Sequence, residues 1–192
     1  MNNIYFSSDT HFGHDRDFLK GPRGFALIEE MNEAIIERFN NVIDNDDDLY
    51  LLGDCILGDT EAGLQCLRRL NGRIHIILGN HDTDKRIEAY EKLENVVEIV
   101  VAKRLKYKKY HFYLSHYPTM TANLEAESLK QVSINLYGHT HQQTNFYNDI
   151  PFMYHVGVDS HDCRPVLLDD IIEECKAKVQ ECKEYLGENE EV

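Results

Sequence analysis

The sequence predicts an α/β protein whose first half forms a parallel sheet and whose second half forms a second, mixed sheet. Over residues 3–93, short apolar runs alternate with amphipathic segments, as in successive β-α-β units. Beyond residue 95, two strand-like runs flank a short charged turn, which is typical of a hairpin. The length of 192 residues suits a single domain over 1–192, with neither internal repeat nor linker.

In the first half we expect three strands, each followed by a helix. The helix over 27–41 carries apolar residues at helical spacing, among them Met31, Ile35 and Phe39. Thr60 is the candidate N-cap of the next helix. The expected strands are 3–8, 48–52 and 73–78, and the expected helices are 27–41, 60–70 and 83–93.

In the second half we expect a hairpin of strands 96–105 and 109–115 around Lys106-Tyr107-Lys108. A short helix follows over 124–132, and further strands lie at 133–137 and 152–158. Residues 168–186 form a terminal helix with one apolar stripe, after which 187–192 should fray.

The composition narrows the classes of partner and compartment. With 20 Lys+Arg and 34 Asp+Glu the formal charge is −14, which argues against tight nucleic-acid binding and against an anionic membrane surface. Excess carboxylate is, however, compatible with binding divalent cations. Five scattered cysteines without a CxxC pair, together with an N-terminus unlike a secretory leader, predict a thiol-reduced, cytoplasmic protein.

Five strand-like segments are each followed directly by side chains of the metal-ligating type. These are Asp9 and His11, Asp54, Asn80, His116, and His139 with His141. In open α/β sheets, ligands bind at the carboxyl edge of the strands, so these side chains should meet. Glycines at 53, 79 and 138 precede three of the groups and allow sharp turns and close approach of the backbone.

The seven candidates are nitrogen and oxygen donors without a thiolate, too many for one tetrahedral zinc ion. They suit two adjacent divalent ions, with Mn²⁺ favoured and Fe, Zn, Co or Ni as alternatives. If one carboxylate bridges, each ion receives four protein ligands, and Asp54 on the central strand is the natural bridge. Two such ions can clamp a phosphoryl group. Each motif alone could be a plain turn, but five in order at strand ends are hard to explain that way.

The series Asp9-x-His11, Gly53-Asp54, Gly79-Asn80-His81-Asp82, His116 and Gly138-His139-x-His141 resembles the calcineurin-like metallophosphoesterase superfamily. The opening SSDTHFGH is similar to a branch of small bacterial and phage phosphoesterases. The resemblance implies a four-layer α/β/β/α sandwich with two mixed sheets and the site at the carboxyl edges of both. It assigns one metal to Asp9, His11, Asp54 and His141, and the other to Asp54, Asn80, His116 and His139.

The same resemblance makes His81 the catalytic histidine that assists the leaving group while a metal-bridging hydroxide attacks phosphorus. In the protein-phosphatase branch, a second acid a few residues after the Gly-Asp pair supports this histidine. Here no acid follows Asp54 until Asp59, so whether Asp82 or another group orients His81 stays open.

Four further residues have weaker claims to a role. His14 and Arg23 are candidates for contacting substrate phosphate, although both could equally be solvated surface residues. Asp159 and His161 are interpreted as polar residues of a surface turn.

We therefore expect a dinuclear metal-dependent phosphoesterase acting on a small phosphorylated substrate. The absence of an obvious cap segment predicts an open site and slightly favours diesters over monoesters. The alternatives are a nuclease of the same fold, for which the basic run over 103–109 is the only local support, and a non-catalytic scaffold for protein binding. The complete ligand set together with His81 argues against the scaffold.

Overall fold

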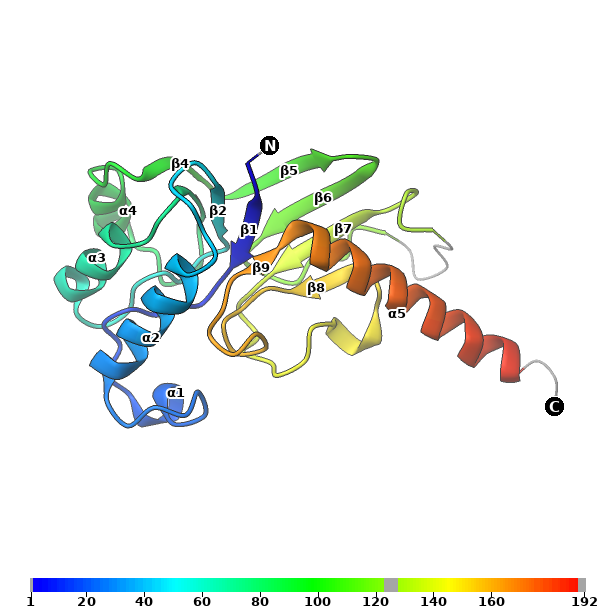
Figure 1. Ribbon diagram of the computed structural model, residues 1–192, viewed down its shortest axis with the longest axis horizontal. Helices are drawn as coiled ribbons and strands as arrows, with labels where there is room; N and C mark the ends of the chain where they lie inside the picture. Colours follow the sequence, from blue (N-terminus) through cyan, green and yellow to red (C-terminus); the bar gives the residue numbers. More distant parts are fainter. Residues whose placement is uncertain (1, 123–127, 190–192) are drawn as a thin grey trace.

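The predicted fold class is confirmed: the protein has two mixed sheets with flanking helices (Figure 1). The computed structural model describes residues 2–122 and 128–189. The five-stranded sheet has the order β4-β3-β2-β1-β9 and the four-stranded sheet the order β5-β6-β7-β8. Helices α2, α3 and α4 flank the first sheet, while α5 runs across the second (Figure 1).

The first sheet is parallel over four strands and gains one antiparallel edge strand. Its strands are β1 (Ile4–Ser7), β2 (Asp48–Leu51), β3 (Arg73–Ile77), β4 (Val96–Val100) and β9 (Val166–Leu167). Its helices are α1 (Asp17–Lys20), α2 (Ile28–Asn40), α3 (Thr60–Arg68) and α4 (Asp84–Tyr90). Two short elements, the two-residue strand β9 and the single turn of α1, are not predicted by the sequence pattern.

The second sheet combines the expected hairpin with two parallel strands. Its strands are β5 (Ala102–Tyr107), β6 (Tyr110–Ser115), β7 (Ser133–Tyr137) and β8 (Met153–His155). A 3₁₀ turn at Tyr147–Asp149 lies between β7 and β8, and helix α5 (Leu168–Asn189) ends the chain's order of elements. The β5–β6 pair is antiparallel, whereas β6, β7 and β8 are parallel neighbours.

Several predicted boundaries are corrected. Residues 96–105 are not one strand: β4 belongs to the first sheet, and the chain crosses at Val101 to begin β5 in the second. The hairpin turn lies at Lys108, where φ is +52°, and not around Tyr107. Helix α3 is capped by Asp59, whose Oδ1 accepts a hydrogen bond from the Ala62 amide at 3.1 Å, and not by Thr60.

Two predictions concern segments at the edge of the described chain. Residues 128–132 form turns and not the expected helix, and residues 124–127 of that prediction lie outside the described residues. Helix α5 continues to Asn189, so residues 187–189 are helical where we expected fraying. No helix within the described ranges is long and apolar enough to cross a membrane.

The core has two parts because β1 is buried on both faces. Adjacent residues of a strand point to opposite sides, so Tyr5 faces the layer of α2 and α3 while Phe6 faces the second sheet. The first layer includes Met31, Ile35 and Phe39 of the predicted helical stripe, all fully buried. Strand β1 therefore contributes to both parts of the core.

Candidate metal centre

The carboxyl edges of the two sheets meet at the site. All of β1, β2 and β3 run parallel, as do β6 and β7, so the residues that follow them emerge on one side. An isolated parallel bridge between Ser8 and Gly157 joins the end of β1 to the loop after β8. The strand-end residues predicted from the sequence are therefore brought together from both sheets.

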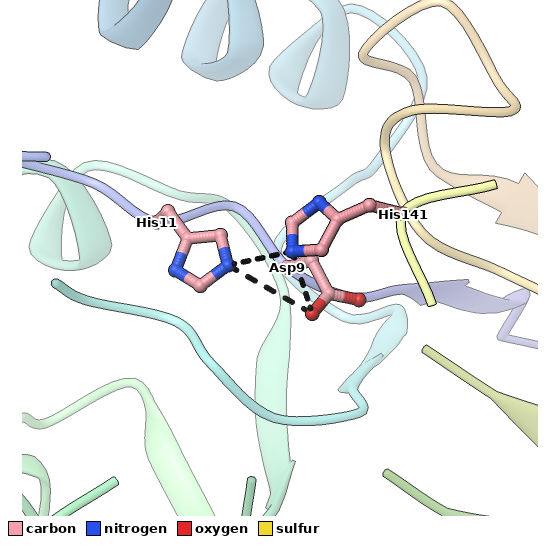
Figure 2. Close-up of side chains that lie close together, drawn as sticks. All are labelled: Asp9, His11 and His141. Atoms are coloured by element: carbon pink, nitrogen blue, oxygen red, sulfur yellow. Dashed lines mark hydrogen bonds and ion pairs between the residues drawn. The ribbon is translucent and has the colours of Figure 1, made fainter. Parts of the chain in front are cut away.

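Asp9, His11 and His141 form the first group of converging side chains (Figure 2). Their ligand-type atoms lie within 4.8 Å of one another. The Nε2 atoms of His11 and His141 are 3.2 Å apart, and each lies 3.9 Å from Asp9 Oδ1. Three donor atoms that face a common point are the arrangement expected of a metal site.

Asp54, Asn80 and His116 converge beside this group. His116 Nε2 lies 3.0 Å from Asn80 Oδ1 and 3.5 Å from Asp54 Oδ2. The same Asp54 oxygen is 4.0 Å from Nε2 of His11, so it lies between the two groups. Asp9, Asp54 and His116 also form a group within 4.8 Å, which makes the two clusters contiguous.

His139 joins the cluster more loosely than the other candidates. Its ring centroid is 5.0 Å from that of His116, and its side chain is exposed. Its backbone amide donates a hydrogen bond of 2.8 Å to Asp9 Oδ2, so the residue also orients a neighbouring carboxylate.

The backbone is strained where the candidate ligands lie. Five of the seven have left-handed φ values, at Asp9 (+57°), His11 (+47°), Asp54 (+53°), His139 (+67°) and His141 (+48°). This conformation costs a non-glycine residue roughly 1–2 kcal/mol and persists only when surrounding contacts hold it. Such strain concentrated on one cluster is typical of a functional site.

Glycine is needed at the three positions before the candidate ligands for different physical reasons. Only Gly53 has a left-handed backbone, with φ of +89°. Gly79 and Gly138 are required by close approach: a Cβ on Gly79 would lie 2.3 Å from Asp54 Oδ1, and one on Gly138 would lie 2.3 Å from Asp9 Oδ2. The predicted need for glycine is thus a sharp turn at one position and lack of space at the other two.

Burial and charged neighbours together set the protonation states of the cluster. It lowers the pKa of His11 to about 3, so the imidazole is neutral. Burial alone would raise the pKa of Asp54, but the hydrogen bond and charge of His116 outweigh it and bring the pKa to about 2. A neutral imidazole and an ionised carboxylate are the forms that bind a metal ion.

The donor set is compatible with metal binding. Asp9 is fully buried, and its Oδ1 has no hydrogen-bond partner among the described residues. An unpaired buried carboxylate oxygen is costly, and burial correspondingly raises the pKa of Asp9. A cation in contact with Oδ1 would remove this cost, so the cluster is a candidate metal centre.

Gly138→Ala should weaken metal binding. The new Cβ would lie 1.9 Å from Ser8 Oγ as well as near Asp9 Oδ2, and both side chains are held by hydrogen bonds. Overpacking of this kind costs typically 1–3 kcal/mol. Urea unfolding in EDTA measures the loss of stability, and calorimetric metal titration measures the loss of metal affinity.

Gly72→Ala is the matched control for that variant, because Gly72 has φ of +90° and close neighbours but lies before β3, at the opposite edge of the sheet. It should lose stability and keep its metal affinity. Unchanged metal affinity in the Gly138 variant would contradict the close-approach argument.

His81 points toward the centre, and Asp82 does not orient it. His81 Nε2 is 3.9 Å from Asp54 Oδ2, with the side chain 43% exposed. The carboxylate of Asp82 instead accepts hydrogen bonds from the amides of Asp54 and Gly79 and from the Tyr90 hydroxyl. Asp82 therefore fastens the loops that carry Asp54 and Asn80.

The structure separates the two weaker substrate candidates. His14 is partly exposed, and its ring centroid is 6.0 Å from that of His11, so it lies at the mouth of the site. Arg23 has a side chain only 2% exposed, and its guanidinium is directed at Asp159 and at backbone carbonyls. That geometry does not suit contact with a substrate.

Asp159 was not recognised as part of the site, and its interpretation as a surface-turn residue is wrong. Its side chain is 6% exposed and accepts a hydrogen bond from His141 Nδ1 at 2.8 Å. The contacts with Arg23 and His141 outweigh burial and lower its pKa well below the usual range. The available signal was its place just beyond β8, since it follows a strand end as the other candidates do. His161 Nε2 donates a hydrogen bond to the His155 carbonyl at 2.8 Å, and the residue is half-buried.

The basic run after β4 is partly neutralised. Lys103 pairs with Glu98, and Lys108 lies 2.6 Å from Asp169 Oδ1. These contacts reduce the local positive charge on which the nuclease hypothesis depends.

Comparison with known proteins agrees with this architecture. A model of the calcineurin-like phosphoesterase superfamily domain matches residues 2–157. The uncharacterized protein MJ1445 of Methanocaldococcus jannaschii is 33% identical over 180 residues, which cover 90% of this chain and 90% of that protein. The Gene 66 protein of Mycobacterium phage L5 is 28% identical over 186 residues, covering 83% of this chain and 88% of that one.

Among solved structures, the protein of unknown function AQ665 from Aquifex aeolicus superimposes with a TM-score of 0.68. It is 24% identical, and the match covers 90% of this chain and 99% of that one, which supports the fold alone. Because the family model spans most of the chain and the archaeal relative matches along nearly all of it, the chain belongs to the calcineurin-like phosphoesterase superfamily.

Proposed function

We propose that the protein is a dinuclear metal-dependent phosphoesterase, built as one domain over residues 1–192, that hydrolyses a small phosphodiester or phosphomonoester. The observation that carries this proposal is the convergence of the strand-end Asp and His side chains around the unpaired, buried Oδ1 of Asp9. Membership of the phosphoesterase superfamily supports the reaction class.

The proposed ligand sets follow the two groups of side chains. Asp9, His11 and His141 would hold one ion, and Asn80, His116 and His139 the other, with Asp54 shared. The position of Asp54 Oδ2 between His11 and His116 supports the shared role. When bound, two divalent ions, of which we favour Mn²⁺, polarise the phosphoryl group and supply a nucleophilic hydroxide near neutral pH.

The chain's own residues would bind the substrate and assist the departure of the alcohol. His81 lies beside Asp54 with part of its ring exposed, and could donate a proton to the leaving oxygen. His14, at the mouth of the site, would contact the phosphate or the group attached to it. The exposed side chain of His139 and the partly exposed ring of His81 support an open site, which suits a diester whose second substituent must be accommodated.

Removing divalent metal should abolish hydrolysis, because every proposed ligand is a nitrogen or oxygen donor aimed at a cation. Protein stripped with EDTA is assayed on phosphomonoesters and phosphodiesters, alone and after addition of Mn²⁺, Zn²⁺, Fe²⁺ or Mg²⁺. We expect activity only with added metal, with Mn²⁺ among the effective ions and at least one diester among the substrates.

His111→Ala serves as the control in this assay, since His111 is exposed on β6 away from the cluster. It should respond to metal as the unmodified protein does. Hydrolysis that persists unchanged in metal-stripped protein would contradict the proposed function.

A further inference from the structure

Asp159 and Arg23 form a buried ion pair that joins three segments of the candidate site. The guanidinium of Arg23 makes a two-pronged contact with Asp159, with Nε to Oδ1 at 2.8 Å and the Nη2 nitrogen to Oδ2 at 2.9 Å. Both side chains are almost completely buried, at 2% and 6% exposure. Arg–carboxylate pairs of this geometry fix orientation as well as supplying energy.

The same guanidinium also holds the loop that carries the first two candidate ligands. Its Nη2 donates to the Asp9 carbonyl at 2.8 Å and its Nη1 to the Thr10 carbonyl at 3.3 Å. Asp9 and His11 have left-handed backbone conformations that need outside contacts to persist. Arg23 supplies such contacts from a segment that itself contributes no candidate ligand.

On its other side, Asp159 orients His141. Asp159 Oδ2 lies 2.8 Å from His141 Nδ1, while Nε2 of the same ring faces Asp9 and His11 (Figure 2). A carboxylate that accepts the Nδ1 proton leaves the Nε2 lone pair free for a metal ion and makes the ring a stronger ligand. The fork of Arg23 prevents the carboxylate from turning away.

The two neighbouring histidines are supported differently. His116 Nδ1 is held by the neutral carbonyl of Leu52 at 2.7 Å. His11 Nδ1 is buried without a hydrogen-bond partner among the described residues. The carboxylate support is therefore given to His141, in the first of the two ligand groups.

We propose that Asp159, locked by Arg23, is a positioning residue that presents His141 to the metal ion of the first group and sets the affinity of that ion selectively. The inference rests on the proposed dinuclear centre. It requires that loss of the Asp159 carboxylate weaken the binding of one ion and leave the binding of the ion near His116 unchanged. The reason is that the Arg23–Asp159 ion pair has no contact with the second group among the described residues.

The test is calorimetric titration of metal-stripped protein with Mn²⁺. The unmodified protein should show two binding events. In Asp159→Asn, which keeps the size and removes the charge, the affinity of one event should fall by about 10–100-fold and the other should be unchanged. Arg23→Lys, which retains the charge but not the fork, should give a smaller loss at the same event and provides a second variant if Asp159→Asn does not fold.

Asp162→Asn is the matched control. Asp162 lies in the same loop and is paired with Arg38 and Arg164, but its side chain is 72% exposed. It should bind both ions as the unmodified protein does.

A double-substitution cycle separates positioning from a general structural role. In a His141→Ala background, adding Asp159→Asn should change metal affinity no further, because Asp159 acts through His141. Additive losses, equal weakening of both ions, or wild-type affinity in Asp159→Asn would overturn the inference while leaving the dinuclear centre standing. Failure of the unmodified protein to bind Mn²⁺ would instead overturn the proposed function together with this inference.

Discussion

Asp54→Ala is expected to release both metal ions, whereas His141→Ala should release one. Asp54 Oδ2 lies 3.5 Å from His116 Nε2 and 4.0 Å from His11 Nε2, so its loss affects both ligand groups. The carboxylate also offsets the repulsion between two cations at close range, which grows in a buried, low-dielectric setting. Its Oδ1 accepts the His81 amide at 2.9 Å, so the loop bearing His81 loses an anchor as well.

Metal content after dialysis, measured by mass spectrometry, tests this prediction. We expect two equivalents in the unmodified protein, about one in His141→Ala and close to none in Asp54→Ala. Hydrolysis by Asp54→Ala should fall by more than the roughly 10²–10³-fold that follows loss of one electrostatic group at a reaction centre.

Asp46→Ala is the control for this comparison, since Asp46 is exposed in the loop before β2, at the far edge of the sheet. It should retain both ions and full activity. Equal metal loss in the Asp54 and His141 variants would mean that Asp54 is an ordinary ligand of one ion.

Most of the site could be predicted because a simple rule of sheet geometry locates it. Residues that follow the carboxyl ends of parallel strands must meet, whatever the details of packing. Asp9, Asp54 and His116 were placed at strand ends by short apolar runs alone, and they lie within a few ångströms of one another. Asp159 obeys the same rule after β8, but its loop contains other polar residues and so resembles a surface turn.

The structural role of Arg23 could not be predicted, because it depends on a contact with Asp159, 136 positions away in the chain. Nothing in its local sequence distinguishes a solvated loop arginine from one buried against a carboxylate. Only the folded arrangement, in which the loop after α1 meets the loop after β8, decides between them.

The errors in the predicted element boundaries have a similar origin. The segment over 96–105 has no glycine or proline to mark a break, so the pattern predicts a single strand. The chain nevertheless passes from one sheet to the other at Val101, which is 74% exposed between two partly buried strands. Likewise, Asp59 and Thr60 are both good N-caps, and only the backbone conformation at Asp59 selects it.

His81→Ala should retain both metal ions and lose turnover. Asn80 and His81 are adjacent, yet Asn80 Oδ1 lies 3.0 Å from His116 Nε2 while the partly exposed His81 ring lies beside Asp54. One residue can therefore bind metal while the other reaches the substrate. We expect turnover to fall by the roughly 10²–10⁴-fold typical of a general acid.

The size of that loss should depend on the leaving group. A nitrophenolate needs little protonation, so a nitrophenyl ester should suffer the smaller loss, and an alkyl ester, whose alkoxide leaves poorly, the larger. Rates on matched nitrophenyl and alkyl esters, with metal content measured on the same samples and His111→Ala as the histidine control, test this directly. Equal losses on both esters would indicate that His81 stabilises charge in the transition state without donating a proton. Loss of metal from the His81 variant would place its imidazole among the ligands and leave the role of the proton donor to another residue, with His14 at the mouth of the site the next candidate.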